Sequence, residues 1–325
     1  MGPRVKHTGN EAIDGKRRHS VDNFEAVLAH AMKLRPIKPK SLIMTIFGDS
    51  VVPRGGVIWL GSIVKLAAEF GLDQALVRTS ALRLVNDGWL VRQQSGKLSY
   101  YSMTAEYVAA DAAYRSQIYS TSDELRRNGW TIFRMFGNRL DRKTIYKLRK
   151  TLTQSGFGQL APLIFIHPSI AKSAVRHIIS TNGKGNDAGI AFFAKEMDQS
   201  PAMMRQLVST AWDLDEVRKG YGEFISSFED LPTLLEKEAP APPIAFALRT
   251  LMVHQFRRLA LRDPRLPEDI FAIGWPGERA FRLIRAAYAG LLVHSEAYLD
   301  QMFQAEGGIA PAADGRLFER FSGAL

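Results

Sequence analysis

The order of local signals between residues 60 and 103 is the feature that most constrains how this chain can fold. Residues 60–70 carry apolar side chains at helical spacing, and Gly71 supplies a C-terminal stop for that predicted helix. Asp73 is a suitable N-cap for a second helix, which ends near Asn86. The connection between them is only three residues long, which is the length of the turn in a helix-turn-helix.

A predicted β-hairpin follows the second helix. Its strands are the β-prone segments Trp89–Arg92 and Leu98–Met103, and the turn formers of residues 94–97 lie between them. An apolar segment, Ser41–Phe47, precedes the two helices and completes the pattern. This order of helices and hairpin is typical of a winged helix-turn-helix, so we predict that this part of the chain binds DNA.

The second predicted helix has one apolar face and one polar face. Val77, Ala81 and Leu84 are spaced at i, i+4 and i+7 and are expected to face the core. Outward Arg side chains alone would be an ordinary solvated helix face, but the turn and the hairpin beside them favour contact with DNA. Arg, Gln and Asn pair with base edges, and Thr contacts phosphates or thymine methyl groups. The predicted DNA-binding residues are Gln74, Arg78, Thr79, Arg83, Asn86, Arg92, Gln94, Lys97 and Tyr100.

The formal net charge of the chain is +10, and it is distributed unevenly over the 325 residues. The first 200 residues carry +13 and the remainder carries −3. A basic half favours a polyanionic partner, and a mildly acidic half indicates a different task. The sequence has no Cys, which excludes disulfides, thiolate metal sites and a Cys nucleophile. The His residues form no metal-binding motif, so we expect no metal site.

The middle of the chain alternates between β-prone and helical segments. The predicted strands are Trp130–Phe136, Leu163–His167 and Gly189–Phe193, and the predicted helices are Arg142–Thr153 and Ile170–Ser180. This order fits a small ferredoxin-like domain of the α+β class. The run Gly156–Ala161 matches a dinucleotide-binding fingerprint, but it follows a helix and precedes a strand, so we interpret it as a turn.

Residues beyond 203 are predicted to be helical throughout. One long predicted helix runs from Ile244 to Arg262 and carries basic side chains at spacings of three and four residues, so that they share one face. This cationic strip could receive an anionic ligand. The alternative is pairing with Glu236, Glu238 or Asp263 of the same chain. The candidate ligand-binding residues are His254, Arg257, Arg258 and Arg262.

These patterns predict an α+β chain of several domains. The first is a flexible basic arm with a short helix, and the last segment is a frayed tail. No signal peptide and no apolar run of about 18 residues is visible, so we expect a cytoplasmic protein without membrane contact. The predicted parts are the arm at 1–37, the winged helix at 38–108, the ferredoxin-like domain at 109–200, the helical domain at 201–305 and the tail at 306–325.

The sequence resembles the PaaX-like transcriptional repressors of phenylacetic acid catabolism. The matching residues run from about Lys38 to Gln304. In the first half they are Ser41–Asp49, Gly55–Ser62, Val77–Thr79, Arg83–Leu90, Ser99–Tyr101, Gly156–Gly158 and Ala161-Pro162. In the second half they are Ala211–Leu214, Phe246–Thr250, Arg262–Pro267 and Trp275–Gly277. The family wing usually reads Gly-Arg-Arg-Ser-Tyr, and residues 96–100 carry one positive charge fewer.

The resemblance implies a winged helix, a central domain like the Cas2 nuclease and a helical C-terminal domain. It further implies a homodimeric repressor, not an enzyme, that is released from double-stranded operator DNA by an aryl-acetyl-coenzyme A. Phenylacetyl-CoA is the typical effector in the family, and no other cofactor is expected. The alternative hypothesis is a metal-dependent nuclease that acts through the Cas2-like domain. Such cleavage needs carboxylates at the site, and the strand Trp130–Phe136 carries none.

Overall fold

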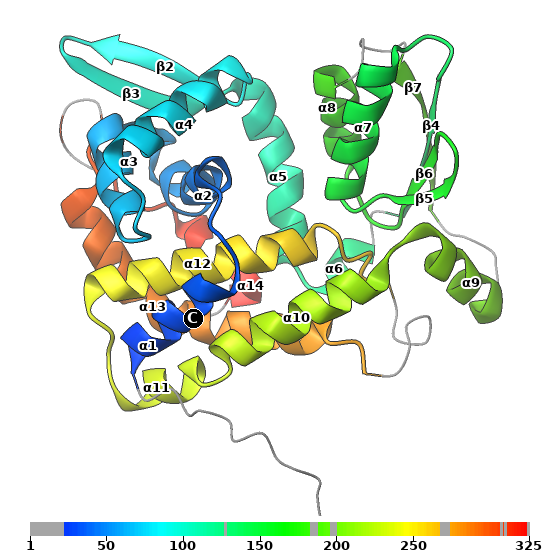
Figure 1. The fold of residues 1–325 in the computed structure, drawn as a ribbon. Coiled ribbons are helices and arrows are strands. Elements are labelled where there is room, and N and C mark those ends of the chain that lie inside the picture. The colour runs from blue at the N-terminus through cyan, green and yellow to red at the C-terminus, as the bar shows by residue number, and fades with distance from the viewer. Residues whose placement is uncertain are drawn as a thin grey trace, which may run out of the picture.

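The fold is described from a computed structural model in which residues 23–126, 129–182, 188–195, 200–266, 274–305, 308 and 311–323 are placed. The architecture is mixed helix and sheet, of the α+β class. Most of the arm predicted at the N-terminus lies outside these residues, but the short helix predicted after it is present as α1 (Phe24–Leu34). Figure 1 shows long helices across the lower part of the molecule, a hairpin at the upper left and a separate sheet at the right.

The first part of the fold, which we call the helix–hairpin unit, comprises residues 39–103. Its helices are α2 (Pro39–Ile46), α3 (Leu60–Ala68) and α4 (Gln74–Asn86), and a π-helical turn (Phe47–Val51) and a 3-10 turn (Val52–Arg54) follow α2. Its strands are β1 (Val57–Trp59), β2 (Leu90–Ser95) and β3 (Leu98–Met103), which form a three-stranded sheet in the order β1-β3-β2. Strand β1 has only three residues and no alternating pattern, and it was not expected from the sequence.

Helix α4 begins and ends where the sequence predicts. The carboxylate of Asp73 accepts a hydrogen bond from the backbone N–H of Leu76 at 2.8 Å, so Asp73 is the N-cap. Gly88, with a φ of +74°, adopts the left-handed conformation that stops the chain from continuing as a helix. The hairpin is tighter than predicted, because Ser95 already pairs with Leu98 and only two residues form the turn.

The second part, which we call the sheet unit, comprises residues 130–194. It contains β4 (Trp130–Met135), α7 (Arg142–Gln154), β5 (Gly158–Ala161), β6 (Ile164–His167), α8 (Lys172–Asn182) and β7 (Gly189–Ala194). The strands form an antiparallel sheet in the order β5-β6-β4-β7. Helices α7 and α8 cover one face (Figure 1), and Phe133, Phe165, Leu148 and Val175 form the core between helices and sheet.

Strand β5 corrects one prediction. The run from Gly156 to Ala161 was expected to be a turn, but its second half pairs with β6 as an edge strand. Gly156, with a φ of +86°, makes the turn, and its carbonyl accepts a hydrogen bond from Nε1 of Trp212 at 2.8 Å. A Cβ atom at Gly158 would lie 2.7 Å from the Trp212 ring. These glycines therefore serve a turn and a close packing contact, and not the cradle of a dinucleotide.

The third part, which we call the helical body, comprises residues 214–302. Its elements are α10 (Leu214–Phe228), α11 (Leu231–Lys237), α12 (Pro242–Ala260) and α13 (Gly277–Met302). Helices α5 (Ala105–Tyr119) and α6 (Ser122–Arg126) lead from the hairpin to the sheet unit, and α9 (Pro201–Ala211) leads back from it. Within the placed residues no helix is long and apolar enough to cross a membrane.

A continuous hydrophobic core joins the helix–hairpin unit to the helical body. It includes Phe47 after α2, Phe246 and Phe256 of α12, and Tyr288 of α13, all of which are fully or almost fully buried. The sheet unit has a separate core. The helix–hairpin unit and the helical body are therefore held together as firmly as the interior of one domain.

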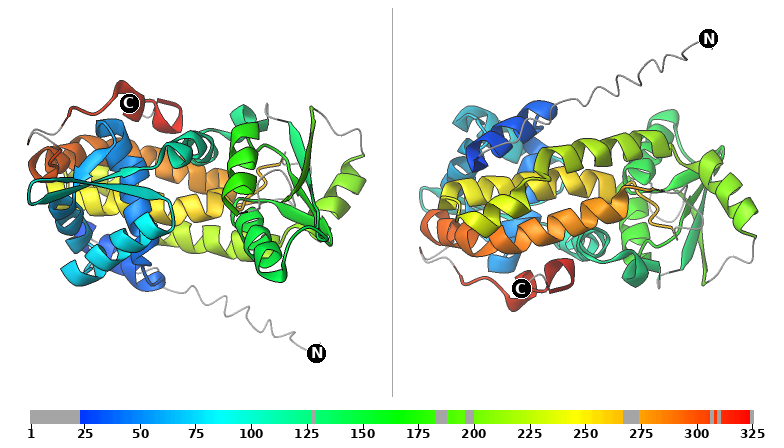
Figure 2. Two further views of the ribbon diagram at one scale, coloured as in Figure 1. Left: turned by 90° about the horizontal axis from the view of Figure 1, so that it is seen from above. Right: turned by 90° about the horizontal axis from the view of Figure 1, so that it is seen from below.

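The C-terminal segment differs from the frayed tail that the sequence predicts. Leu317 and Phe321 are buried, and the Phe321 ring meets the ring of Tyr119 edge-on at 5.0 Å. Figure 2 shows the segment lying beside α5 and the helical body. Its anchors are single apolar residues in a polar stretch, so periodicity could not reveal them. The short helix α14 (Arg320–Gly323) also supplies a buried Arg320.

A buried ionic network ties the π-helical turn to four other elements, which are α5, α12, α13 and α14. The carboxylate of Asp49 accepts hydrogen bonds from Tyr119, Tyr288 and Arg320 at 2.9, 3.1 and 2.6 Å. The Nε atom of Arg249 lies 3.1 Å from the other oxygen of Asp49. Arg249, from α12, also donates to Glu296 of α13 at 2.5 Å and to Ser50 at 2.9 Å. Since both Asp49 and Arg249 are fully buried, each charge depends on the other for its stability.

Replacement of Arg249 by Met should lower the free energy of unfolding by about 3–5 kcal/mol, because it removes one of the two cations that balance the buried Asp49 and also a partner of Glu296. The measurement is urea denaturation followed by circular dichroism. The matched control is Arg282→Met, in an exposed pair with Glu278 on α13, which should cost less than about 1 kcal/mol. Equal effects of the two replacements would contradict the role of the network.

Candidate nucleic-acid interface

The polar face of α4 is exposed, as the sequence predicts. Gln74, Arg78, Thr79, Arg83 and Asn86 all have exposed side chains, whereas Val77, Ala81 and Leu84 are buried in the core. The Gln74 amide, oriented with its oxygen toward Arg78, accepts from Nε and Nη2 of Arg78 at 2.9 and 2.8 Å. The two side chains that could form bidentate contacts with bases are thus already held side by side.

Leu82 also belongs to this surface, although the sequence analysis did not select it. Its side chain is 48% exposed on α4 among the polar residues. An apolar side chain on a helix that enters the major groove can contact the methyl group of thymine. The signal for it was present, since Leu82 lies outside the i, i+4, i+7 row of the core residues.

The hairpin extends beyond α4 as a two-stranded ribbon (Figure 1). Every residue of β2 after Leu90 is exposed, and Lys97 lies in the exposed turn. Arg92 donates to the hydroxyl of Ser99 across the ribbon at 2.9 Å, and the amide of Gln94 donates to the Gly96 carbonyl at 3.2 Å. The side chains of Arg92, Gln94 and Lys97 are therefore available on the hairpin surface.

Tyr100 does not belong to this surface. Its side chain is 7% exposed, and its backbone pairs with Trp59 on one side and Gln93 on the other. Residue 100 lies on the central strand β3, which is covered on both edges. The prediction that Tyr100 contacts DNA is therefore wrong, because its neighbours on both adjacent strands, Trp59 and Gln93, leave its side chain almost no exposed surface.

The four candidate ligand-binding residues, three in α12 and Arg262 just after it, do not form one site. His254 is 5% exposed, and its Nδ1 lies 2.9 Å from the hydroxyl of Thr45, which also accepts from Arg257 at 3.1 Å. Arg262 instead forms an ion pair with Glu216 of α10 at 2.6 Å. Partial burial and the charges of Arg35 and Arg262 lower the pKa of Arg258. The strip is therefore divided between α2 and α10, and Arg262 pairs with Glu216 and not with the acids expected from the sequence.

The buried imidazole of His254 is neutral in the folded protein. Burial lowers its pKa from 6.5 to about 3, and the charges of Arg257 and Arg258 act in the same direction. The unfolded chain takes up a proton below pH 6.5, whereas the folded chain does not. Stability therefore falls as the pH drops below 6.5.

The wild type should lose more unfolding free energy than His254→Gln when the pH falls from 7 to 5, and the difference should be about 2 kcal/mol. Protonation of His254 in the unfolded chain contributes about 1.36 kcal/mol for each pH unit below 6.5, and the variant lacks this contribution. The measurement is urea denaturation at both pH values. His30→Gln, at an exposed position of α1, is the control and should keep the wild-type pH dependence. An unchanged pH dependence in His254→Gln would show that His254 is not held neutral.

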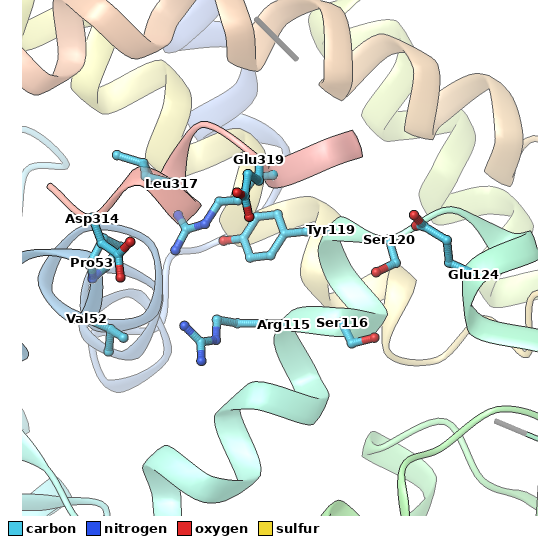
Figure 3. Close-up of a pocket in the computed structure, with 11 residues that line it drawn as sticks. Val52, Pro53, Arg115, Ser116, Tyr119, Ser120, Glu124, Asp314, Leu317 and Glu319 are labelled. Atoms are coloured by element: carbon cyan, nitrogen blue, oxygen red, sulfur yellow. The ribbon is translucent and has the colours of Figure 1, made fainter. Parts of the chain in front are cut away.

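Two cavities adjoin α5. One, of about 330 Å³, lies between the end of α5 and the C-terminal segment, and Figure 3 shows Arg115, Tyr119, Asp314 and Glu319 around it. Its Arg320 is already engaged with Asp49. The other cavity, of about 780 Å³, lies between α2 and α4 on one side and α7 and α8 on the other, and Arg83 and Arg257 both line it. Sequence periodicity could not reveal either cavity, because each is assembled from distant segments.

Among the placed residues, no group of three or more His, Asp and Glu side chains lies close enough together to hold a metal ion. The arrangement offers instead an exposed helix with hydrogen-bonding side chains, a protruding ribbon beside it, and a large cavity behind the same helix. An exposed polar helix beside a protruding ribbon is typical of a DNA-binding protein.

The comparisons with known proteins place the chain in a family. Residues 38–107 match the model described as PaaX-like protein, and residues 212–301 match the model described as PaaX-like protein C-terminal domain. A curated relative from Escherichia coli strain K12, named transcriptional repressor PaaX, is 31% identical over 306 residues, which are 93% of this chain and 96% of the relative. The chain therefore belongs to the PaaX-like family.

The chain is also similar to one solved structure, the uncharacterized protein Rv0674 from Mycobacterium tuberculosis. The match covers 73% of this chain and 89% of that chain, at 20% identity and with a TM-score of 0.40. The E. coli relative is named as a repressor and not as a nuclease.

Proposed function

We propose that this protein is a transcriptional repressor that binds double-stranded DNA through a winged helix-turn-helix at residues 38–108. The observation that carries the proposal is the exposed polar face of α4 beside the protruding hairpin. An α-helix fits the major groove, and the hairpin then lies over the adjacent backbone. The name of the E. coli relative, which this chain matches over almost its whole length, supports repression as the outcome of binding.

The remaining parts form a ferredoxin-like central domain and a helical C-terminal domain in this proposal. The strand order β5-β6-β4-β7, with one helix after β4 and another after β6, supports the ferredoxin-like assignment. The boundaries proposed for these domains remain 109–200 and 201–305.

The repressor acts as a homodimer in this proposal. Two copies of α4 would enter successive major grooves about 34–36 Å apart, and a pseudo-palindromic operator would match the two-fold axis. The phosphate backbone attracts the basic first half of the chain without regard to sequence, whereas discrimination depends on the few side chains of α4.

The effector in this proposal is an aryl-acetyl-coenzyme A such as phenylacetyl-CoA, and the regulated genes serve phenylacetate catabolism. The support is membership of the PaaX-like family. The effector must bind the DNA-incompetent conformation more tightly, because a ligand with equal affinity for both conformations shifts nothing.

Replacement of Arg78 by Ala should weaken operator binding by about 1–3 kcal/mol, a factor of roughly 5 to 150, if Arg78 forms a bidentate contact with a guanine. The measurement is fluorescence anisotropy with labelled promoter DNA from the upstream region of the gene. Arg78 is exposed, so the circular dichroism spectrum should not change.

Arg285→Ala is the matched control, because Arg285 is an exposed Arg on α13, away from the proposed interface. It should bind the operator like the wild type. Wild-type affinity in Arg78→Ala, with the same base preference, would remove α4 from the proposed interface.

Phenylacetyl-CoA added to the preformed protein–operator complex should release the DNA in a concentration-dependent manner. The measurement is a gel shift with the same promoter, with CoA and acetyl-CoA as controls that lack the aromatic group. Retention of the operator at every phenylacetyl-CoA concentration would contradict the proposed effector and leave the DNA-binding part intact.

A further inference from the structure

The cavity of about 780 Å³ lies where the helix–hairpin unit, α5 and the sheet unit meet. Its wall includes Met44 of α2, Leu76 of α4, Tyr114 of α5 and Ile178 of α8. Cavities of about 300–1,000 Å³ at domain junctions, with mainly apolar walls and a few polar groups, are the usual sites for small-molecule ligands.

An aromatic cluster forms one wall of this cavity. The ring of Trp89 stacks on the ring of Tyr107, with centroids 5.4 Å apart and an angle of 28° between the planes. The ring of His177, on α8, meets Tyr107 edge-on at 6.2 Å. Burial lowers the pKa of His177, which favours the neutral imidazole in this wall. Flat apolar rings with both stacked and edge-on neighbours are suited to an aromatic ligand.

Positive charge surrounds the same cavity. Four basic side chains line it, namely Lys38, Lys40, Arg83 and Arg257, and the acidic side chains that line it are Asp87 and Glu106. Asp87 is already paired with Lys40. The excess of positive charge favours a ligand with an anionic end, since charge-assisted hydrogen bonds to carboxylates or phosphates are the strongest that Lys and Arg make.

One face of the helix α4 forms part of the cavity wall. Leu76, Ser80 and Arg83 line the cavity and are spaced at i, i+4 and i+7, so they share one side of the helix. Gln74 and Arg78 lie on the opposite side, at roughly 100° per residue around the helix. A ligand in the cavity would therefore touch the same helix that carries the proposed DNA-reading side chains.

We propose that this cavity is the effector site, and that it takes an aromatic acyl compound with an anionic end. The inference rests on the proposed function and specifies where its effector binds. The aromatic group lies against Trp89 and Tyr107, and the anionic end lies toward Arg257 and Lys38. Because the walls belong to different units, an occupied cavity fixes the separation of α4 from α7 and α8, and the position of α4 that fits the operator is disfavoured.

Binding is measured in the absence of DNA through the fluorescence of Trp89. Phenylacetyl-CoA is the probe, and phenylacetate and CoA alone are the two comparison arms. The stacking of Trp89 on Tyr107 places the fluorophore in the wall, so occupation of the cavity should change its emission. The Trp89→Phe variant identifies this signal among the five Trp residues of the chain.

Thr151→Phe fills part of the cavity and should raise the dissociation constant for phenylacetyl-CoA at least tenfold. Thr151, on α7, lines the cavity and is partly buried. The matched control is Thr153→Phe, which makes the same change two residues further along α7, at an exposed position outside the cavity lining, and should bind like the wild type. If Thr151→Phe does not fold, Gln154→Phe at an exposed position of the lining serves the same purpose.

The same variants are then tested for release of operator DNA. In Thr151→Phe the concentration of phenylacetyl-CoA needed for release should rise at least tenfold, and in Thr153→Phe it should not change. If the wild type did not bind the operator, the proposed function would be contradicted. The cavity would still be tested, because ligand binding is measured on protein without DNA.

Three results would overturn the inference. The first is that Thr151→Phe and Gln154→Phe bind the ligand as tightly as the wild type does. The second is that the wild type binds neither phenylacetyl-CoA nor phenylacetate. The third is that CoA alone binds as tightly as phenylacetyl-CoA. Binding of phenylacetate that is weakened by Thr151→Phe would support the cavity and identify the free acid as the ligand. Binding of the thioester alone, weakened in the same way, would support the cavity and identify the thioester.

Discussion

The buried carboxylate of Asp49 is the point on which the association of the two halves of the chain depends. It lies just after α2, and its partners Arg249, Tyr288 and Arg320 come from α12, α13 and the C-terminal segment. A charge without water must be surrounded by donors, and Arg249 and Tyr288 reach Asp49 only when the helix–hairpin unit is seated on the helical body. The network therefore selects this one arrangement of the two parts, while the continuous apolar core provides most of the stabilisation.

This distribution of contacts determines which relative motions of the parts require little free energy. Movement of the helix–hairpin unit relative to the helical body would open a shared core and expose paired charges. The sheet unit has its own core and faces α4 across a cavity. It is joined to the rest by a smaller apolar cluster that includes Ile166, Trp212 and Leu266, so a shift there disturbs less buried apolar surface than a shift within the shared core. Switching in such a molecule is therefore expected between the sheet unit and the rest, because packed interiors resist small continuous deformation.

Local signals allowed much of the fold to be predicted, and long-range contacts account for the rest. The cap at Asp73 and the stop at Gly88 define α4 from the sequence alone, because both act on neighbouring backbone groups. Helix α5 was not predicted, since its alternating Ala and polar residues give no clear apolar face. The burial of Phe321 and of Tyr100 depends on partners far away in the sequence. For the same reason spacing alone groups His254, Arg257, Arg258 and Arg262, although Arg257 contacts α2 and Arg262 contacts α10.

The position of Arg83 shows why a ligand site and a DNA surface on one helix can control each other. Its side chain is exposed at the edge of the polar face of α4, and it also lines the cavity behind that helix. Coupling of this kind is reciprocal, so a ligand that weakens operator binding is itself bound less tightly by the DNA complex. To change the DNA-competent fraction from 99% to 1%, the effector must discriminate between the two conformations by a factor of about 10⁴, or about 5.5 kcal/mol. The effector would supply this free-energy difference if, in one conformation, its aromatic group lost its stacking partners and its anionic end lost a Lys or Arg contact. The free energy of these contacts together is of the right order.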